Sequence, residues 1–352
     1  MKTIFLRIGL VALIIILLVI LISKLSNTEE KYLEVRSQFQ PIMQTPTERN
    51  WHKKKLTSIS LNSEMNDTLL NSMIVKSFND TLYVADYADM KIKRFTSNGR
   101  YIDKFGENIG RGPSDLTQIL DISFSDEALY VIDAETQLIK IFSKRTNKST
   151  QAFRVDQFTF RVIVLNESKV TQSLSQDLFR TYNRHNKLHK IFGELTNNQF
   201  ANIMSFGGTL LPSNKKNEFI YVPTYASYLL FYNTEGEFIK SIQTIDRLPF
   251  PKSEATNTGV RAPKPDLVVQ STTFNDEFIF IQYSRRPLPD SSNDQFNIHH
   301  SFVDVYTRDG ENYIKSIILP QRSAGINTIG DSLYSINFST RKIEAFLLPE
   351  IE

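Results

Sequence analysis

The chain has 352 residues, of which 41% are hydrophobic and 22% charged, a composition typical of a globular protein rather than a disordered one. Its 41 basic and 38 acidic residues leave a net charge of +3, which is too balanced to indicate a nucleic-acid partner. The sequence has no cysteine, and this excludes disulfides, cysteine–zinc sites, a thiol nucleophile and a lipid-modified cysteine.

The N-terminus predicts a membrane anchor. Residues 8–22 are an unbroken apolar run, and residues 4–6 extend it across Arg7. A helix over residues 4–22 would be about 28 Å long, close to the thickness of a bilayer core. We therefore expect a signal-anchor transmembrane helix within residues 1–23, with the membrane as a partner through residues 4–22.

The flanking charges predict the orientation of this helix. Lys2 and Arg7 precede the apolar run, whereas Lys24 alone follows it closely. The positive-inside rule then places the N-terminus in the cytoplasm and the rest of the chain in the periplasm or outside, anchored to the inner membrane. The alternative is a cleaved signal peptide and a secreted form, but no small-x-small cleavage site follows the run. Residues 24–50 are polar and predict a stalk.

The rest of the chain, residues 51–352, repeats one phrase. Its best copy is LYVADYADMKIKRFTSNGRYIDKFG at residues 82–106, which predicts strands at 82–86, 91–95 and 100–105. The phrase recurs roughly every fifty residues. Further copies of its first strand begin at Leu129, Phe219, Phe278 and Leu333, and a degenerate copy is expected around Val170.

Each unit has the same order of elements. An apolar strand such as 119–124 comes first, the Leu-Tyr-Val strand follows, and a third strand ends in an aromatic residue. A turn ending in glycine, as at Asn98-Gly99 and Asp309-Gly310, leads to a fourth strand. Six units of four antiparallel strands predict an all-β fold, a six-bladed β-propeller. A β-sandwich is the alternative, but it would not produce a repeat of fixed length.

The two ends of this region predict how the ring closes. The last unit ends after its third strand, at 342–347, and so lacks a fourth. An orphan strand at 56–61 precedes the first unit. We expect the two to pair, so that the orphan strand completes the last blade.

The first two units and their link resemble the NHL-type repeats and the TolB-like six-bladed propellers of bacterial envelope proteins. The residues that carry the resemblance are Tyr83-Val84-Ala85-Asp86, Lys91-Ile92, Phe95, Gly99, Phe105-Gly106 and Gly110-Arg111-Gly112-Pro113, with Tyr130-Val131-Ile132-Asp133 and Ile139-Lys140-Ile141-Phe142 in the second unit. The usual Asn before the basic residue is Asp89 here. The resemblance implies a propeller in the cell envelope, and it implies no particular activity.

The long loops predict the location of a ligand site. Links between blades and loops from second to third strands share one face of a propeller, and the long segments 105–118, 246–266 and 285–298 are all of these kinds. We call this side the long-loop face, and long loops on a rigid scaffold are where binding residues concentrate. Its predicted ligand-binding residues are Arg111, Arg247, Arg261, Lys264, Arg285 and Arg286, with Asp115, Asp266, Asp290 and Asp294 interleaved. They predict a basic-rimmed pocket for an anionic glycan, peptide or polyphosphate; the alternative is ordinary solvated loop charge.

We therefore expect a non-enzymatic binding module whose partner is a protein, peptide or glycan. The alternative is a metal-dependent hydrolase or lyase of the lactonase kind, which needs carboxylate and amide ligands at the central channel. The sequence shows no convincing set of such ligands, so no catalytic residue, metal ligand or cofactor is predicted. His299-His300 and Ser213-x-x-Lys216 are weak candidates, and Asp86 and Asp133 are expected to bond to backbone.

Overall fold

The computed structural model describes residues 33, 35–156, 159–166, 168–174, 177–196, 203–252, 254–256, 259–261, 267–285 and 301–351, with backbone alone at 254–256, 259–261, 267 and 285. The predicted membrane anchor at residues 4–22 lies outside these ranges. Within them, no helix is both long enough and apolar enough to cross a membrane.

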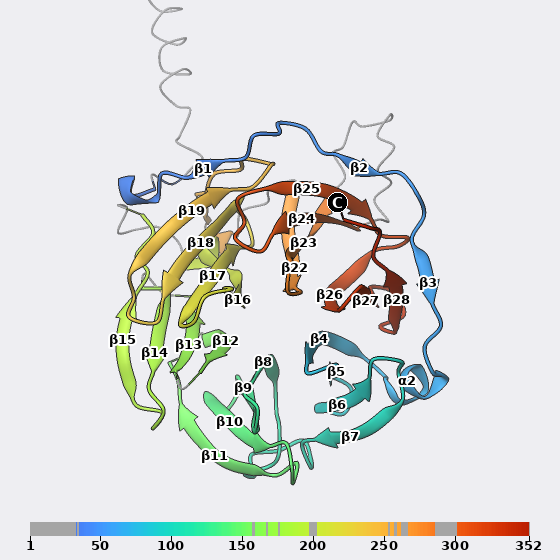
Figure 1. The fold of residues 1–352 in the computed structure, drawn as a ribbon. Coiled ribbons are helices and arrows are strands. Elements are labelled where there is room, and N and C mark those ends of the chain that lie inside the picture. Colours follow the sequence, from blue (N-terminus) through green and yellow to red (C-terminus); the bar gives the residue numbers. More distant parts are fainter. Residues whose placement is uncertain are drawn as a thin grey trace, which may run out of the picture.

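Six antiparallel blades form a closed ring, which confirms the predicted six-bladed propeller (Figure 1). Blades 1 to 3 consist of β4 (Ser72–Phe78), β5 (Thr81–Asp86), β6 (Lys91–Thr96) and β7 (Tyr101–Phe105); β8 (Ile119–Phe124), β9 (Ala128–Asp133), β10 (Leu138–Ser143) and β11 (Ser149–Arg154); and β12 (Thr159–Leu165), β13 (Ser168–Ser173), β14 (Phe179–Tyr182) and β15 (Leu188–Phe192). Blades 4 to 6 consist of β16 (Gly208–Pro212), β17 (Glu218–Pro223), β18 (Tyr228–Asn233) and β19 (Phe238–Gln243); β22 (Leu267–Phe274), β23 (Phe278–Arg285), β24 (Ser301–Thr307) and β25 (Tyr313–Ile318); and β26 (Ser323–Ile329), β27 (Ser332–Asn337), β28 (Ile343–Leu347) and β3 (Thr57–Ile59). The degenerate copy expected around Val170 is β13.

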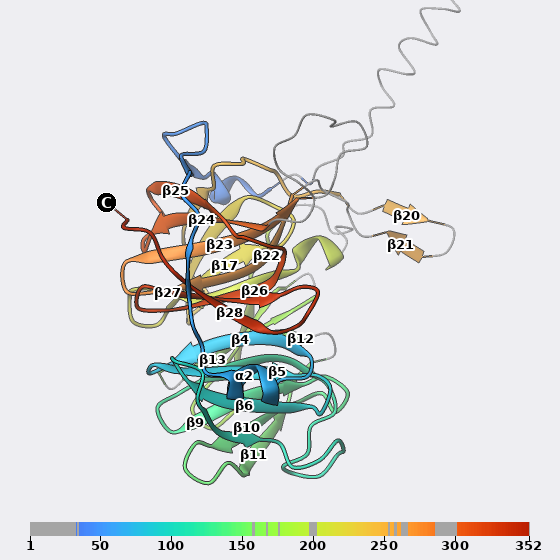
Figure 2. The ribbon, with the colours of Figure 1, turned by 90° about the vertical axis from the view of Figure 1, so that its right-hand side faces the viewer.

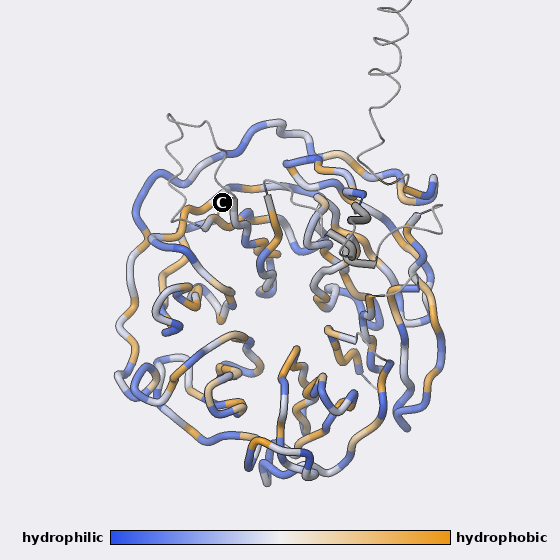
Figure 3. Tube along the Cα trace, turned by 180° about the vertical axis from the view of Figure 1, so that it is seen from behind, coloured by the Kyte–Doolittle hydropathy of each residue, from blue (hydrophilic) through white to orange (hydrophobic). Residues whose placement is uncertain are grey.

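The apolar repeat forms the contacts between blades. The aromatic residue that ends each predicted third strand is buried, and the five concerned are Phe95, Phe142, Tyr232, Tyr306 and Phe346. Hydrophobic stretches are present in the strands of all the blades (Figure 3). The glycine turns have the backbone they were predicted to need, because Gly99 has φ +87° and Gly310 has φ +75°, a region that a Cβ disfavours.

The N-terminal residues wrap the outside of the ring. We call residues 35–62 the strap, shown in blue in Figure 1. Its strands β1 (Ile42–Met43) and β2 (Trp51–His52) add in parallel to β19 and β25, the outer strands of blades 4 and 5. Residues 24–50 were expected to form a stalk, but residues 35–50 instead lie against the blades, where the backbone of the outer strands offers unpaired hydrogen-bonding groups.

The strap ends by closing the ring. In β3, Thr57, Ser58 and Ile59 pair with Leu347, Phe346 and Ala345 of β28, antiparallel and within the two ranges named from the sequence. A short helix, α2 (Ser63–Thr68), then leads into blade 1, with Asn62 as its N-cap. The last blade therefore combines three C-terminal strands with one strand of the N-terminal strap.

Candidate functional site

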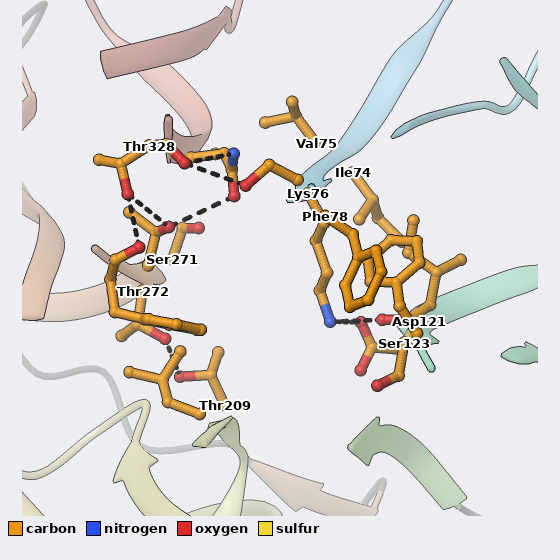
Figure 4. Close-up of a pocket in the computed structure, with 18 of the residues that line it drawn as sticks. Ile74, Val75, Lys76, Phe78, Asp121, Ser123, Thr209, Ser271, Thr272 and Thr328 are labelled. Carbon is orange, nitrogen blue, oxygen red and sulfur yellow. Dashed lines mark hydrogen bonds and ion pairs between the residues drawn. The ribbon is translucent and has the colours of Figure 1, made fainter. Parts of the chain in front are cut away.

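A cavity of about 580 Å³ lies at the centre of the ring. Its walls come from the first strands of all six blades, which are β4, β8, β12, β16, β22 and β26. Each first strand runs from the long-loop face towards the tight turns of the opposite face. Figure 4 shows part of the polar lining of this channel.

One wall carries charged groups from blades 1 to 3. The ammonium of Lys76 in β4 lies 2.7 Å from Asp121 Oδ1 in β8 and donates to the carbonyl of Ile122, also at 2.7 Å. The other oxygen of Asp121 accepts the backbone N–H of Val162 in β12 at 3.0 Å. Asp121 therefore links three consecutive blades, and Lys76 is left with one N–H that has no partner among the described residues.

Arg161 of β12 belongs to the same wall, near its long-loop end. Its Nε donates to the carbonyl of Gly208 at 3.1 Å, and its Nη1 to those of Leu120 at 3.3 Å and Phe160 at 3.0 Å. No carboxylate of the described residues forms an ion pair with this guanidinium, and its Nη2 donates to none of their acceptors. Since guanidinium has five N–H donors in a planar fork, Arg161 retains two for a ligand.

The opposite wall is built from hydroxyl groups of blades 4 to 6 (Figure 4). Thr209 of β16 and Thr272 of β22 are joined by a 2.6 Å hydrogen bond between their Oγ1 atoms. Ser271 of β22 contacts the backbone of β26, and Ser77 of β4 donates to the carbonyl of Thr328 at 2.9 Å. These bonds complete a ring of side-chain contacts around the channel, with a charged half and a hydroxyl half.

The long-loop face is recognisable by its long connections. Figure 2 shows the hairpin of β20 (Glu254–Thr256) and β21 (Gly259–Arg261) extending from this side, away from the blades. The 3₁₀ turn at Ile203–Phe206, which precedes blade 4, lies on the same side.

The predicted basic residues of this face are only partly described. The side chain of Arg111 is 75% exposed and lies 3.3 Å from Glu135, while Arg247 is exposed and donates to the carbonyl of Gln44 in the strap at 3.1 Å. These two stand in the links before blades 2 and 5, three blades apart, so the ring does not bring them together. Arg261 ends β21 and Arg285 ends β23, with backbone described only. Lys264 and Arg286, together with Asp266, Asp290 and Asp294, lie outside the described residues.

The carboxylate of Asp115 forms hydrogen bonds within its own loop. It accepts the backbone N–H groups of Asn108 and Gly112, both at 3.1 Å. A Cβ at Gly112 would come within 2.5 Å of Asp115 Oδ2, so this approach requires glycine. The Gly-x-Gly-Pro segment thus folds closely around the carboxylate of Asp115 in the link between blades 1 and 2.

Asp86 and Asp133 bond to backbone as expected and, in addition, to a lysine of the next strand. Asp86 accepts the N–H groups of Leu70 and Asn71 and lies 2.7 Å from Lys93. Asp133 accepts the N–H of Gln118 and lies 3.0 Å from Lys140. Burial alone would raise the pKa of Asp86, but these N–H donors and Lys93 hold it below its usual value. Both carboxylates therefore fasten a blade to the link that precedes it.

The remaining weak candidates are not joined into a site by the residues that the structure describes. His299 and His300 lie outside the described residues, and Ser213 contacts Asn214 rather than Lys216. Among the residues that the structure describes, no group of three or more His, Asp or Glu side chains is placed to hold a metal ion.

The three charged channel residues were not among those predicted from the sequence. Each interrupts an apolar first strand: Lys76 in SMIVKSF, Asp121 in ILDISF and Arg161 in TFRVIVL. A charge inside an apolar strand of a repeat is the signal that could have located them, because it needs a polar partner or solvent.

The comparisons with known proteins show the fold. No family model matches the sequence, and no curated protein matches it. A "putative exported protein" from Bacteroides fragilis aligns with a TM-score of 0.59 and 10% identity, over 89% of this chain and 99% of that one. A member of the DUF4221 family from Bacteroides vulgatus aligns at 0.58 with 11% identity, over 87% and 99%. At such identities the likeness establishes the propeller architecture and leaves the ligand to be argued from the site.

Proposed function

We propose that the protein is a membrane-anchored, extracytoplasmic binding module that takes a peptide, a glycan or a segment of a partner protein into its channel. The observation that carries this proposal is the cavity of about 580 Å³, whose lining comes from six blades and includes donors without a partner in the described chain. Its size lies within the range of about 300–1,000 Å³ that is usual for ligand sites. The hairpin of β20 and β21, which belongs to the link before blade 5, extends from the long-loop face, as recognition loops do on rigid scaffolds.

The proposed location rests on the N-terminal apolar run, residues 4–22, and on the exported-protein description of one fold neighbour. We also propose a relationship to the NHL-type or TolB-like propellers, which the Gly110-Arg111-Gly112-Pro113 segment supports. The enclosure of Asp115 by this segment supplies a physical reason for its two glycines.

The location can be tested with single cysteines, because the natural sequence has none. Thr146 is exposed in a turn of blade 2, and Thr3 precedes the predicted anchor. We expect Thr146→Cys to react with a membrane-impermeant maleimide in spheroplasts, and Thr3→Cys to react only after the membrane is permeabilised. Labelling of both positions in intact spheroplasts, or of neither, would contradict the proposed orientation.

Binding in the channel can be tested by filling it. Thr272 lines the cavity, and Thr272→Trp would occupy the space between the hydroxyl wall and the charged wall. The matched control is Thr150→Trp on the exposed outer strand β11. In a thermal-shift screen of peptides and oligosaccharides against the full chain, we expect ligands that raise the Tm of the wild type and of Thr150→Trp to lose their effect on Thr272→Trp. Ligands that stabilise all three proteins equally would place the site elsewhere.

A further inference from the structure

Two cations reach the same edge of β8 from opposite sides. Lys76 donates to the carbonyl of Ile122, and Arg161 donates to that of Leu120. These carbonyls are two residues apart on one strand, which corresponds to about 7 Å. The ammonium and the guanidinium therefore flank one stretch of the channel wall.

The charge of this wall suits one anionic group. Lys76 and Arg161 are positive and Asp121, which is paired with Lys76, is negative, so one positive charge is uncompensated within the wall. The Nη2 of Arg161 presents two N–H groups in one plane, the geometry that a carboxylate accepts. At the other end of the cavity lie the exposed carboxylates of Asp80 and Asp276, which would repel a ligand carrying charge along its whole length.

The facing wall supplies neutral hydrogen-bonding groups. Thr209, Thr272 and Ser271 carry hydroxyls that both donate and accept, and none of them is paired with a charged side chain of the described residues. Such a wall complements the hydroxyl groups of a sugar ring, which also both donate and accept. Figure 4 shows the two walls on opposite sides of the channel, Lys76 and Asp121 on one and Thr209, Thr272 and Thr328 on the other.

We propose that the channel binds an acidic sugar, with the carboxylate held by Arg161 and Lys76 at the edge of β8 and the hydroxyls on the threonine and serine wall. This inference rests on the proposed function, since it names the ligand class of the same cavity. Of the anionic glycan, peptide and polyphosphate ligands expected from the loop sequence, the proposal favours a glycan with isolated carboxylates over a polyphosphate chain.

The test compares D-glucuronate with D-glucose, which differ at C6 alone, by isothermal titration calorimetry on the full chain in detergent micelles. We expect saturable binding of glucuronate with a Kd below about 1 mM and binding of glucose at least tenfold weaker. Arg161→Gln should weaken glucuronate binding at least tenfold, Lys76→Met should weaken it several-fold, and Arg145→Gln, in an exposed turn, should leave it unchanged.

Arg161 also joins three blades, so loss of binding in Arg161→Gln counts only if its circular dichroism spectrum and Tm match the wild type. Thr272→Val is the independent variant, because it removes one hydroxyl from the opposite wall without changing a charge; it should weaken glucuronate several-fold. Equal affinity for glucose, unchanged affinity in folded Arg161→Gln and Thr272→Val, binding of inorganic phosphate alone, or no glucuronate binding at millimolar concentration would each overturn the proposal. If glucuronate fails while other ligands still stabilise the wild type and not Thr272→Trp, the ligand class is wrong and the binding channel stands.

Discussion

Deleting residues 51–62 is expected to lower the free energy of unfolding by more than about 5 kcal/mol, most of the stability of an ordinary domain. The deletion removes β3, leaves the edge of β28 unpaired and opens the ring between blades 6 and 1. It also removes Leu56, which is 5% exposed and packs in one cluster with Val303, Leu333 and Phe346. Far-UV circular dichroism during urea titration is the measurement, and melting like the full chain would disprove the closure.

A point substitution separates the contribution of side-chain packing at Leu56 from that of the deleted strand. Leu56→Ala should cost about 2–5 kcal/mol, as truncations of buried leucines do. Its matched control is Leu70→Ala, because Leu70 lies between α2 and β4 and is 65% exposed. That change should stay within about 0.5 kcal/mol. If both variants unfold at the same urea concentration, the strap contributes little to the core.

The strap is also clamped by a buried ion cluster. Arg49 of the strap makes two hydrogen bonds to the carboxylate of Asp304 in β24, at 3.1 and 3.0 Å, and also pairs with Asp246 in the link before blade 5. Its guanidinium lies 4.7 Å from the centre of the Phe302 ring. Asp304 is fully buried. The loss of solvation on burial outweighs the attraction of Arg49, and it raises the pKa of this carboxyl to about 6.

The raised pKa of Asp304 predicts a pH dependence of stability. The folded protein holds a proton on this carboxyl up to about pH 6, whereas the unfolded chain releases it near the ordinary value of 3.8. The contribution of Asp304 to the free energy of unfolding is therefore largest at low pH and is lost as the pH rises through 6. Between pH 4.5 and 7.5 this loss amounts to about 2 kcal/mol.

Asp304→Asn should remove this component, because the amide does not titrate. The difference in unfolding free energy between the wild type and Asp304→Asn should therefore change by about 2 kcal/mol across that pH range. The fluorescence of Trp51 suits the measurement, since it is the one tryptophan of the sequence and its ring lies 5.5 Å from that of Phe302. Parallel pH profiles for the two proteins would show that Asp304 does not titrate in this range.

The sequence alone was sufficient to predict the six blades. Each blade buries its side chains through a pattern that is local in the chain: a Leu-Tyr-Val strand, an aromatic residue that ends the next strand, and a glycine turn. The repeat also predicted that residues 56–61 pair with the last blade, because that blade lacked a fourth strand. It predicted the backbone role of Asp86 and Asp133, because the two residues recur at one position of the repeat.

The path of the strap could not be predicted, because β1 and β2 have two residues each and pair in parallel with strands about two hundred residues or more away. Nothing near Arg49 in the chain indicates a partner, since Asp304 follows 255 residues later. A short extended segment takes its structure from the edge that it covers, and that edge exists only in the folded ring.

The repeat thus determined, from the sequence by itself, which residues form the six blades, because local hydrophobic periodicity specifies strands and turns. Only the tertiary structure decided what lines the channel. Lys76, Asp121 and Arg161 stand in three different blades, and they meet because closing the ring brings the first strands side by side around one axis. The site proposed here belongs to the ring as a whole and to no single repeat.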